Sequence, residues 1–367
     1  MKFNKLTSAL MICAAIGVVS LPVSTAFAAP DAAKIAERKA RKSQAVGEKV
    51  GKAIGKAYEL YGANQIAEAI AILEPLEPTN AFDKAYLARF LGSLYVEKNP
   101  EKAIKYLKEA IKPDILSFTD QAAALRNLAD LSIMAKKYQD AIGYYNKWLD
   151  FTGELDPNVE MRIANCFYEM KQYNKVIAPA DRAIAHFKEP KKEPYIMKYA
   201  SYYELKQTKK VIEVLEEAVV IFPKEKTFWV QLGNFYSADE QFAKALAVID
   251  MAYKQGYLTT ENEIKLLANL YNNNNVPYKA AATLEKHMKS GLVKKDRAIL
   301  MSIASSYNSA REFEKAAAFF GQAAQLSSEG DIYRRQGNAY LMANKNAEAV
   351  TALRKSLELG VKDKGKV

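Results

Sequence analysis

The sequence predicts an all-α protein, a right-handed α-solenoid of about nine helical hairpins. Three observations predict this fold. Pairs of short amphipathic stretches recur along the chain, their spacing averages 35 residues, and each stretch carries a small residue at a matching place. A fixed period near this length, with helix–turn–helix content, is typical of solenoids in which each unit packs mainly against its neighbours.

The stretch WVQLGNFY shows the pattern of a first helix most clearly. Trp229, Gly233 and Tyr236 lie three or four positions apart and therefore share one face of a helix. Glycine costs roughly 1 kcal/mol against alanine inside a helix. We therefore expect Gly233 to lie where the first helix crosses the second, against Ala245, because only small side chains allow a close approach there.

The small residue of the second helix marks nine units, at Ala69, Ala103, Ala141, Val176, Val211, Ala245, Ala280, Ala316 and Ala349. Its partner on the first helix is Ala57, Gly92, Ala129, Ala164, Ala200, Gly233, Ala268, Ala304 and Gly337. An aromatic residue follows three positions later at Tyr95, Phe167, Tyr203, Tyr236, Tyr271, Tyr307 and Tyr340. Isolated helices of about 13 residues are marginal in water, so these hairpins should be stable only when stacked.

This pattern resembles the tetratricopeptide repeat, whose first helix reads W-x2-L-G-x2-Y and whose second helix reads A-x3-F-x2-A. The matching residues of the clearest unit are Trp229, Leu232, Gly233, Tyr236, Ala245, Ile249 and Ala252. The resemblance covers residues 50–360. It implies a superhelix whose first helices line a concave groove that binds other molecules.

Residues 1–28 have the layout of a secretory signal peptide. Lys2 and Lys5 precede an apolar run over 6–23, and the sequence A-F-A that ends at Ala28 is a small-x-small cleavage signature. An uncleaved membrane anchor is the alternative, but the run is shorter than the roughly 20 residues of a spanning helix. The layout predicts a periplasmic protein, with secretion as the alternative, and no transmembrane segment after cleavage.

Residues 29–49 form a basic N-terminal segment for which we expect a polar helix. Between Asp31 and Lys56 the chain holds eight Lys or Arg and three Asp or Glu. A solvated helix face is one interpretation, and docking to an acidic partner or an anionic lipid surface is the other. We expect no nucleic acid partner for an exported protein. The solenoid, residues 50–360, is followed by a basic tail, residues 361–367.

No catalytic or metal-binding constellation stands out in the sequence. The two histidines, His186 and His287, fall in different units, and Cys166 is the only cysteine outside the signal peptide. Metal sites need clustered cysteine, histidine and carboxylate ligands, and the glycines do not form a phosphate-binding loop. We therefore expect no enzyme activity, no metal and no cofactor.

The tetratricopeptide resemblance implies that the residue after each small residue of the first helix points into the groove. From the second unit onward these residues are Ser93, Asp130, Asn165, Ser201, Asn234, Asn269, Ser305 and Asn338. All are short and polar, and an asparagine amide can donate to a peptide carbonyl and accept from its N–H at once. We take Asn165, Asn234, Asn269 and Asn338 as candidate partner-binding residues, with solvation of the helix surface as the alternative.

Two basic residues accompany this row of amides and are also candidates. Lys265 precedes Asn269 by four positions, and Arg334 precedes Asn338 by four. Lysine and asparagine at this spacing resemble part of the carboxylate clamp by which some tetratricopeptide domains hold a peptide C-terminus. The clamp is incomplete, because other residue types stand at two of its positions, Ser302 and Asp331. We therefore expect a peptide-binding groove without a high-affinity C-terminal clamp.

Residues 40–76 and 228–286 are also similar to periplasmic tetratricopeptide proteins of Gram-negative bacteria whose genes accompany a TonB–ExbB–ExbD cluster. That resemblance implies a non-catalytic scaffold in TonB-dependent transport, whose partner is an envelope protein or peptide, TonB-system components included. The alternative is a solenoid that binds peptidoglycan or another glycan in envelope assembly, for which an exposed groove aromatic such as Tyr168 is the candidate contact. The sequence does not determine the identity of the partner or the oligomeric state.

Overall fold

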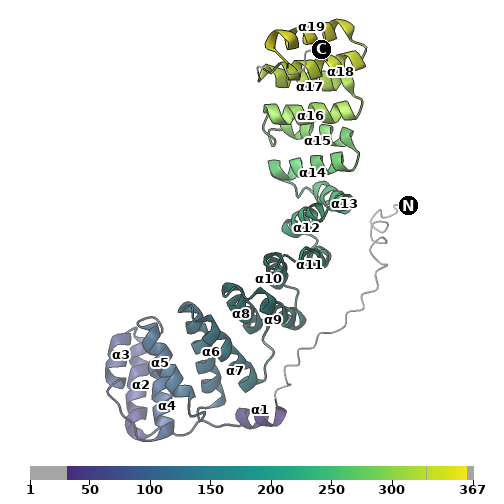
Figure 1. Cartoon of the computed structure of the whole chain (residues 1–367). Coiled ribbons are helices and arrows are strands. Elements are labelled where there is room, and N and C mark those ends of the chain that lie inside the picture. The colour runs from purple at the N-terminus through teal and green to yellow at the C-terminus, as the bar shows by residue number, and fades with distance from the viewer. Residues whose placement is uncertain (1–30, 328, 362–367) are drawn as a thin grey trace, which may run out of the picture. The chain divides into compact units, whose positions relative to one another are not determined.

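The structure, a computed structural model, describes residues 31–327 and 329–361. These residues form 19 helices, α1 to α19, and no strand (Figure 1). The all-helical fold class is therefore confirmed. The predicted signal peptide, residues 1–28, lies outside the described residues, as does the predicted tail apart from residue 361. No helix among the described residues is both long and apolar enough to cross a bilayer.

The helices in the first part of the chain are α1 (Ala32–Lys39), α2 (Glu48–Gly62), α3 (Ile66–Leu73), α4 (Ala81–Tyr95), α5 (Pro100–Ile111), α6 (Phe118–Met134) and α7 (Tyr138–Thr152). They are followed by α8 (Pro157–Glu169), α9 (Tyr173–His186), α10 (Lys192–Glu204), α11 (Thr208–Ile221), α12 (Lys226–Ala238) and α13 (Phe242–Lys254). The last helices are α14 (Glu261–Asn273), α15 (Pro277–Lys289), α16 (Arg297–Ser309), α17 (Phe313–Gln325), α18 (Gly330–Met342) and α19 (Asn346–Leu359).

The described residues fall into two compact units. We call residues 31–135 with 143–154 the N-terminal unit, and residues 136–142 with 155–361 the C-terminal unit. The boundary crosses α7, whose first residues belong to the C-terminal unit. From α2 to α6 and from α8 to α19, consecutive helices pack against each other, so each unit is a stack of hairpins.

Each unit has an apolar core of its own. In the N-terminal unit this core includes Leu73 and Leu107, which are fully buried. In the C-terminal unit one core runs through every helix from α10 to α18, with Phe228, Ile249 and Leu267 among its fully buried side chains. A core that continues from hairpin to hairpin is what a solenoid requires, because a single hairpin leaves one apolar face exposed.

The glycines of the first helices lie at the helix crossings, as the sequence predicts, but they contact a different residue of the second helix. A Cβ atom on Gly233 would lie 2.3 Å from Ile249 Cδ1, and one on Gly92 would lie 2.7 Å from Leu107 Cγ. The close neighbour of Gly233 is therefore one helical turn beyond the predicted Ala245. The space beside the glycine is filled by a large apolar side chain of the second helix.

The fifth hairpin departs from the predicted alignment by one residue. Ser201 was expected to face the groove, but it is fully buried in α10. Tyr203, the expected aromatic of the core stripe, is 60% exposed. Both predictions are wrong, and so is the choice of Ala200 as the small residue at the crossing.

The turns inside the hairpins show the correct register. The first helix of nearly every hairpin is followed by a residue with left-handed backbone, for example Lys171 and Lys206, with φ of 57° and 58°. These two residues are 35 positions apart, so Tyr199 takes the place that Ala164 has in the fourth unit. The alignment from sequence assumed a small residue at every helix crossing. In the fifth hairpin the crossing position holds Tyr199, so the alignment selected the neighbouring Ala200.

A repeated polar contact links neighbouring hairpins of the C-terminal unit. The Tyr271 hydroxyl of α14 donates to Asp250 of α13 at 2.5 Å, and the Lys279 ammonium of α15 lies 5.6 Å from the centre of the Tyr271 ring. Burial raises the pKa of Tyr271, as does its hydrogen bond to Asp250, so the hydroxyl keeps its proton. The same arrangement occurs one unit before and one unit after, as Glu216–Tyr236–Lys244 and Glu285–Tyr307–Lys315.

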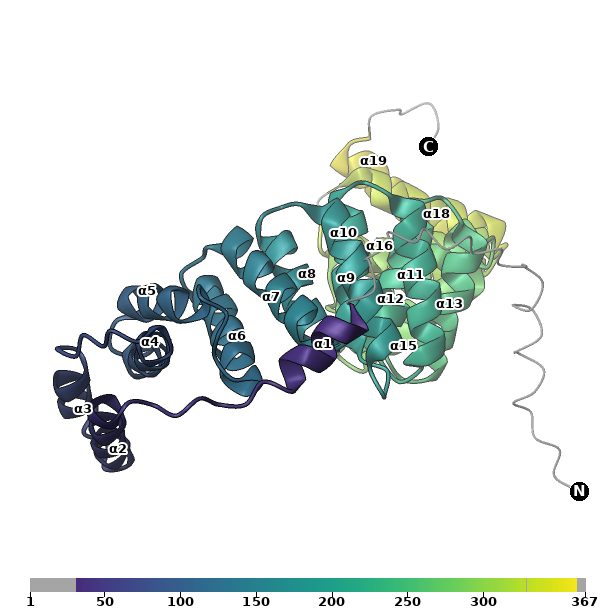
Figure 2. The same cartoon turned by 90° about the horizontal axis from the view of Figure 1, so that it is seen from below.

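The basic N-terminal segment does not continue as one polar helix into the first hairpin: its described residues, 31–49, hold α1 and only the start of α2. α1 ends at Lys39, and an irregular stretch over residues 40–47 joins it to α2 (Figure 2). Two of its arginines bind acidic residues of the same unit: Arg38 donates to the backbone oxygen of Asp150 at 2.7 Å, and Arg41 pairs with Asp114 at 2.8 Å. The Arg38 side chain is 20% exposed and the Arg41 side chain is 25% exposed. The interpretation of this segment as a solvated helix face is therefore wrong for these two residues.

Candidate functional site

α14 supplies one wall of the candidate site, and its start is fixed by a capping box. The Thr260 side chain accepts a hydrogen bond from the Glu263 backbone, and Glu263 Oε2 accepts from the Thr260 backbone N–H at 2.9 Å. Lys226 of α12 also binds Glu263, with Nζ–Oε1 of 2.8 Å. The carboxylate thus holds the first turn of α14 to the preceding hairpin, which sets the direction of the side chains further along.

α16 supplies the opposite wall. Its N-cap Asp296 accepts a hydrogen bond from the Ile299 backbone N–H at 2.9 Å. Between α14 and α16 lies a cavity of about 430 Å³, within the size range of small-ligand sites. Its polar lining consists of Lys265, Asn269, Asn272, Ser302, Ser305 and Ser306, and its apolar lining of Leu284, Ala298, Ile299 and Met301.

Two of the residues predicted from sequence, Lys265 and Asn269, line this cavity. Asn269 is exposed, as is Ser302 opposite it, so both can bind a molecule that enters. The Lys265 ammonium forms an ion pair with Glu261 of the same helix, which lowers the pKa of the Glu261 carboxyl. The lysine is therefore held at the cavity by a neighbour while its other N–H donors remain available.

A hydrogen bond between the two walls closes one side of the cavity. The Asn272 amide donates to Ser306 Oγ at 3.0 Å, across the gap between the two first helices. Neither residue was predicted from sequence. Asn272 lies three positions after Asn269, on the same face of the helix, so the asparagine run of residues 272–275 was the signal that could have identified it.

The other predicted site residues do not line this cavity. Two of them are exposed, Asn234 on α12 and Asn338 on α18. Asn165 on α8 is partly buried. Arg334 donates to Asp331 at 3.1 Å, so an adjacent carboxylate neutralises its charge. Tyr168 packs edge-on against Tyr173, with ring centres 5.2 Å apart, and burial raises its pKa.

Cys166 of α8 does not line this cavity. Cys166 is fully buried, and burial raises the pKa of its thiol to about 11. A thiol with so high a pKa is a poor nucleophile at neutral pH. Among the residues that the structure describes, no group of three or more His, Cys, Asp or Glu side chains could hold a metal ion.

Comparison with protein families finds a match for part of the stack of hairpins. Residues 93–158, from the end of α4 to the start of α8, match the family model described as the tetratricopeptide repeat. The match covers 66 of the 367 residues of the chain. Tetratricopeptide folds are typically non-catalytic scaffolds that bind protein or peptide partners. No curated protein sequence matches the chain significantly.

Solved structures that match this chain show a low overall similarity to it. A tetratricopeptide repeat protein from Parabacteroides merdae is 13% identical over 83% of this chain and 100% of its own, with a TM-score of 0.39. YrrB, described as a tetratricopeptide protein with an unusual peptide-binding site, is 16% identical over 49% of this chain and 91% of its own, with a TM-score of 0.39. MamA from Desulfovibrio magneticus is 21% identical over 47% of this chain and 94% of its own, with a TM-score of 0.36.

Proposed function

We propose that this tetratricopeptide protein is a non-catalytic periplasmic scaffold that binds an extended segment of another envelope protein between α14 and α16. The observation that carries the proposal is the convergence of two amides, a lysine and three hydroxyls from two successive first helices around one cavity. Asn269 can pair with a peptide group as donor and acceptor at once. Ser302 and Ser305 offer further hydrogen bonds from the opposite wall.

The apolar lining fits the same kind of ligand. Leu284, Ile299 and Met301 line the cavity beside the polar residues, and methionine adapts to side chains of varied shape. A peptide offers both backbone polar groups and apolar side chains. Lys265 adds a positive charge, which favours a segment with a carboxylate nearby.

The test is site-specific crosslinking in cells. A photo-crosslinking amino acid at Ser302 should capture an envelope protein, and mass spectrometry should place the crosslink in an extended segment. The Lys265→Ala/Asn269→Ala variant should lose that product. Asn262→Ala, which changes an exposed asparagine of α14 outside the cavity, is the matched control and should retain it. Unchanged capture by the double variant would overturn the proposal.

The compartment and the transport role rest on the sequence. The signal-peptide layout of residues 1–28 supports export, and the similarity of residues 40–76 and 228–286 supports a link to a TonB–ExbB–ExbD system. Fractionation should recover the mature chain in the periplasm. Deletion of the gene should reduce TonB-dependent uptake, and TonB-system proteins should be enriched among the crosslinked partners. Cytoplasmic recovery or unaffected uptake would contradict these two parts of the proposal.

A further inference from the structure

α1 is attached to the N-terminal unit mainly through charged side chains. None of its residues is buried, and the irregular stretch over residues 40–47 joins it to α2. Since little apolar surface is buried in this contact, the hydrophobic effect contributes little to it. α1 lies on a surface formed by the turn after α5, the start of α6 and the end of α7. We call this the α1-docking surface, which consists of Asp114, Phe118, Asp150, Phe151 and Gly153.

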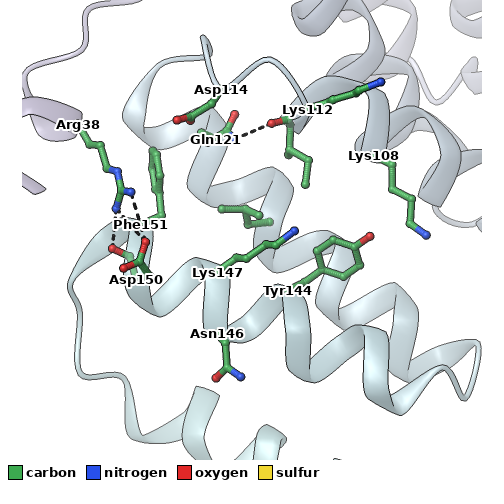
Figure 3. A pocket seen from close by; sticks show the side chains of 12 residues that line it. Arg38, Lys108, Lys112, Asp114, Gln121, Tyr144, Asn146, Lys147, Asp150 and Phe151 are labelled. Atoms are coloured by element: carbon green, nitrogen blue, oxygen red, sulfur yellow. Dashed lines mark hydrogen bonds and ion pairs between the residues drawn. The ribbon is translucent and has the colours of Figure 1, made fainter. Parts of the chain in front are cut away.

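Two arginines bind the two carboxylates of this surface. Arg38 donates to the backbone oxygen of Asp150 at 2.7 Å and to its Oδ2 at 3.3 Å (Figure 3). Arg41 makes a two-point pair with Asp114, at 2.8 and 3.1 Å. A planar guanidinium group can match a carboxylate in this way, whereas an ammonium group cannot. The surface therefore favours arginine over lysine.

An aromatic ring of the same surface contacts both guanidinium groups. The centre of the Phe151 ring lies 5.1 Å from the guanidinium carbon of Arg38 and 5.7 Å from that of Arg41. Phe151 is only 4% exposed and stacks on Phe118 with ring centres 5.4 Å apart, so its position is fixed. Because the face of an aromatic ring attracts a cation, Phe151 adds to the binding of both arginines.

A glycine gives the surface a place for an apolar side chain. Gly153 has φ of 68°, and a Cβ atom at this position would collide with the Ile35 side chain. Ile35 precedes Arg38 by three positions, and Arg38 precedes Arg41 by three. The surface thus binds one apolar residue and two arginines that follow one another at intervals of three.

The two carboxylates stay accessible to solvent while α1 is bound. The Asp114 side chain is 49% exposed and the Asp150 side chain is 68% exposed. Both line a cavity of about 740 Å³, whose lining includes Arg38 of α1 (Figure 3). An arginine of another segment can therefore reach either carboxylate through this cavity and exchange with the arginine of the N-terminal segment.

We propose that the α1-docking surface binds a basic segment of another protein, and that α1 is an autoinhibitory segment that occupies this surface in the free chain. The partner segment carries an apolar residue and two arginines at the spacing of Ile35, Arg38 and Arg41. The short linker keeps α1 at an effective concentration on the order of mM at the surface. A partner therefore displaces α1 when it binds more tightly or is held to the chain by a second contact. This inference concerns the N-terminal unit and does not rest on the α14–α16 site.

The experiment measures the binding of a fluorescein-labelled peptide, with the sequence of residues 31–43, to the full mature chain by fluorescence anisotropy. Arg38→Gln/Arg41→Gln releases α1 and leaves the surface intact. This variant should bind the peptide at least about tenfold more tightly than the natural chain, in which α1 competes. Lys34→Gln/Lys42→Gln removes the same charge from exposed residues of the segment and should stay within about twofold of the natural chain. Equal gains in the two pairs would mean attraction by net charge alone and would overturn the proposal.

A second pair of variants tests whether the carboxylates of the surface cause the gain. Asp114→Asn/Asp150→Asn, added to the double arginine variant, should abolish the gain while circular dichroism shows an unchanged helix content. Asparagine tolerates the left-handed backbone of residue 114, which has φ of 52°. Glu101→Gln/Glu109→Gln removes the same charge from exposed residues of α5 and should preserve the gain. A gain that survives the aspartate changes would show that the peptide binds elsewhere and that the inference is wrong.

Two further measurements test the identity of the occupant. A peptide with lysine in place of both arginines should bind the double arginine variant at least about tenfold more weakly, because an ammonium group cannot form the two-point pair. Equal binding of the two peptides would refute selection for arginine. In sedimentation velocity, Asp114→Asn/Asp150→Asn should leave the oligomeric state of the natural chain unchanged. Loss of a dimer in this variant would show that α1 of a second copy occupies the surface, which would overturn the assignment to another protein.

Discussion

Gly233 of α12 lies directly against Ile249 of α13: a methyl group at Gly233 would come within 2.3 Å of the Ile249 side chain. Both residues belong to the continuous core of the C-terminal unit, where Ile249 is fully buried. Glycine is therefore required at this crossing for space. The opposite case is Gly55 in α2, where an added Cβ would meet nothing within 4 Å.

Alanine should have opposite effects at these two glycines. Gly233→Ala should destabilise the protein by about 1 kcal/mol, because overpacking costs about 1–3 kcal/mol and the gain in helix propensity is only about 1 kcal/mol. Gly55→Ala should stabilise it by about 0.5–1 kcal/mol. Urea unfolding followed by circular dichroism measures both. In an Ile249→Ala background, which lacks both side-chain carbon atoms that lie 2.3 Å from the added methyl group, Gly233→Ala should cost less. A similar gain at both glycines in the natural chain would contradict the crossing argument.

The tryptophan that marks the repeat in the sequence is not the residue that fills the core. Phe228 is fully buried, whereas Trp229 is partly exposed and its Nε1–H donates to the Pro223 carbonyl at 2.9 Å. Phe228→Ala should therefore cost about 3–5 kcal/mol and Trp229→Ala less. Trp229→Phe keeps most of the packing and should cost about 0.5–1.5 kcal/mol for the lost hydrogen bond. Equilibrium urea unfolding gives the order; a larger loss for Trp229→Ala than for Phe228→Ala would contradict it.

The left-handed turn residues offer a stabilising substitution. Lys206 has φ of 58°, a conformation that costs a residue with a Cβ roughly 1–2 kcal/mol. Lys206→Gly should raise the free energy of unfolding by about 1 kcal/mol. Lys209→Gly, at an exposed helical position of α11, should lower it by about 0.5–1 kcal/mol. Thermal unfolding of the two variants should shift in opposite directions, and a loss of stability in both would refute the assignment of strain to Lys206.

His287 should make stability depend on pH near neutrality. Burial lowers the pKa of His287 below its usual value of 6.5, with a further contribution from Lys286, and Nε2 lies 2.9 Å from the Tyr253 hydroxyl. His287 binds a proton more tightly in the unfolded chain than in the folded protein. The contribution of the neutral imidazole to the free energy of unfolding is therefore fully present above pH 6.5, and it is lost as the pH falls through the pKa of His287 in the folded protein. Urea midpoints should decline over that range in the natural chain and less in His287→Gln.

The imidazole signals in a proton NMR titration provide the direct check. The sequence contains two histidines, so His287→Gln assigns the signal of the other one, His186. The His287 signal should titrate below pH 6.5 in the folded protein. A midpoint at or above that value would contradict the role of burial.

The sequence by itself determined the helical hairpins, their period and the exposed row of amides. These features follow from the regular directions of side chains on a helix, which repeat with the local pattern of residues. The places of Asn234, Asn269 and Asn338 could therefore be predicted one unit at a time. The same reasoning failed at Ser201, because the fifth unit has no small residue at its crossing to mark the register.

Only the tertiary structure decided which residues come together. Lys265 and Asn269 line one cavity with the serines of α16 because α14 and α16 belong to successive stacked hairpins. The periodic pattern of the sequence does not show which neighbouring side chain an exposed residue faces. Arg41 binds Asp114 across 73 residues of chain, which ties the basic segment to the turn after α5. Local periodicity sets the direction of each side chain, whereas long-range packing sets its partner.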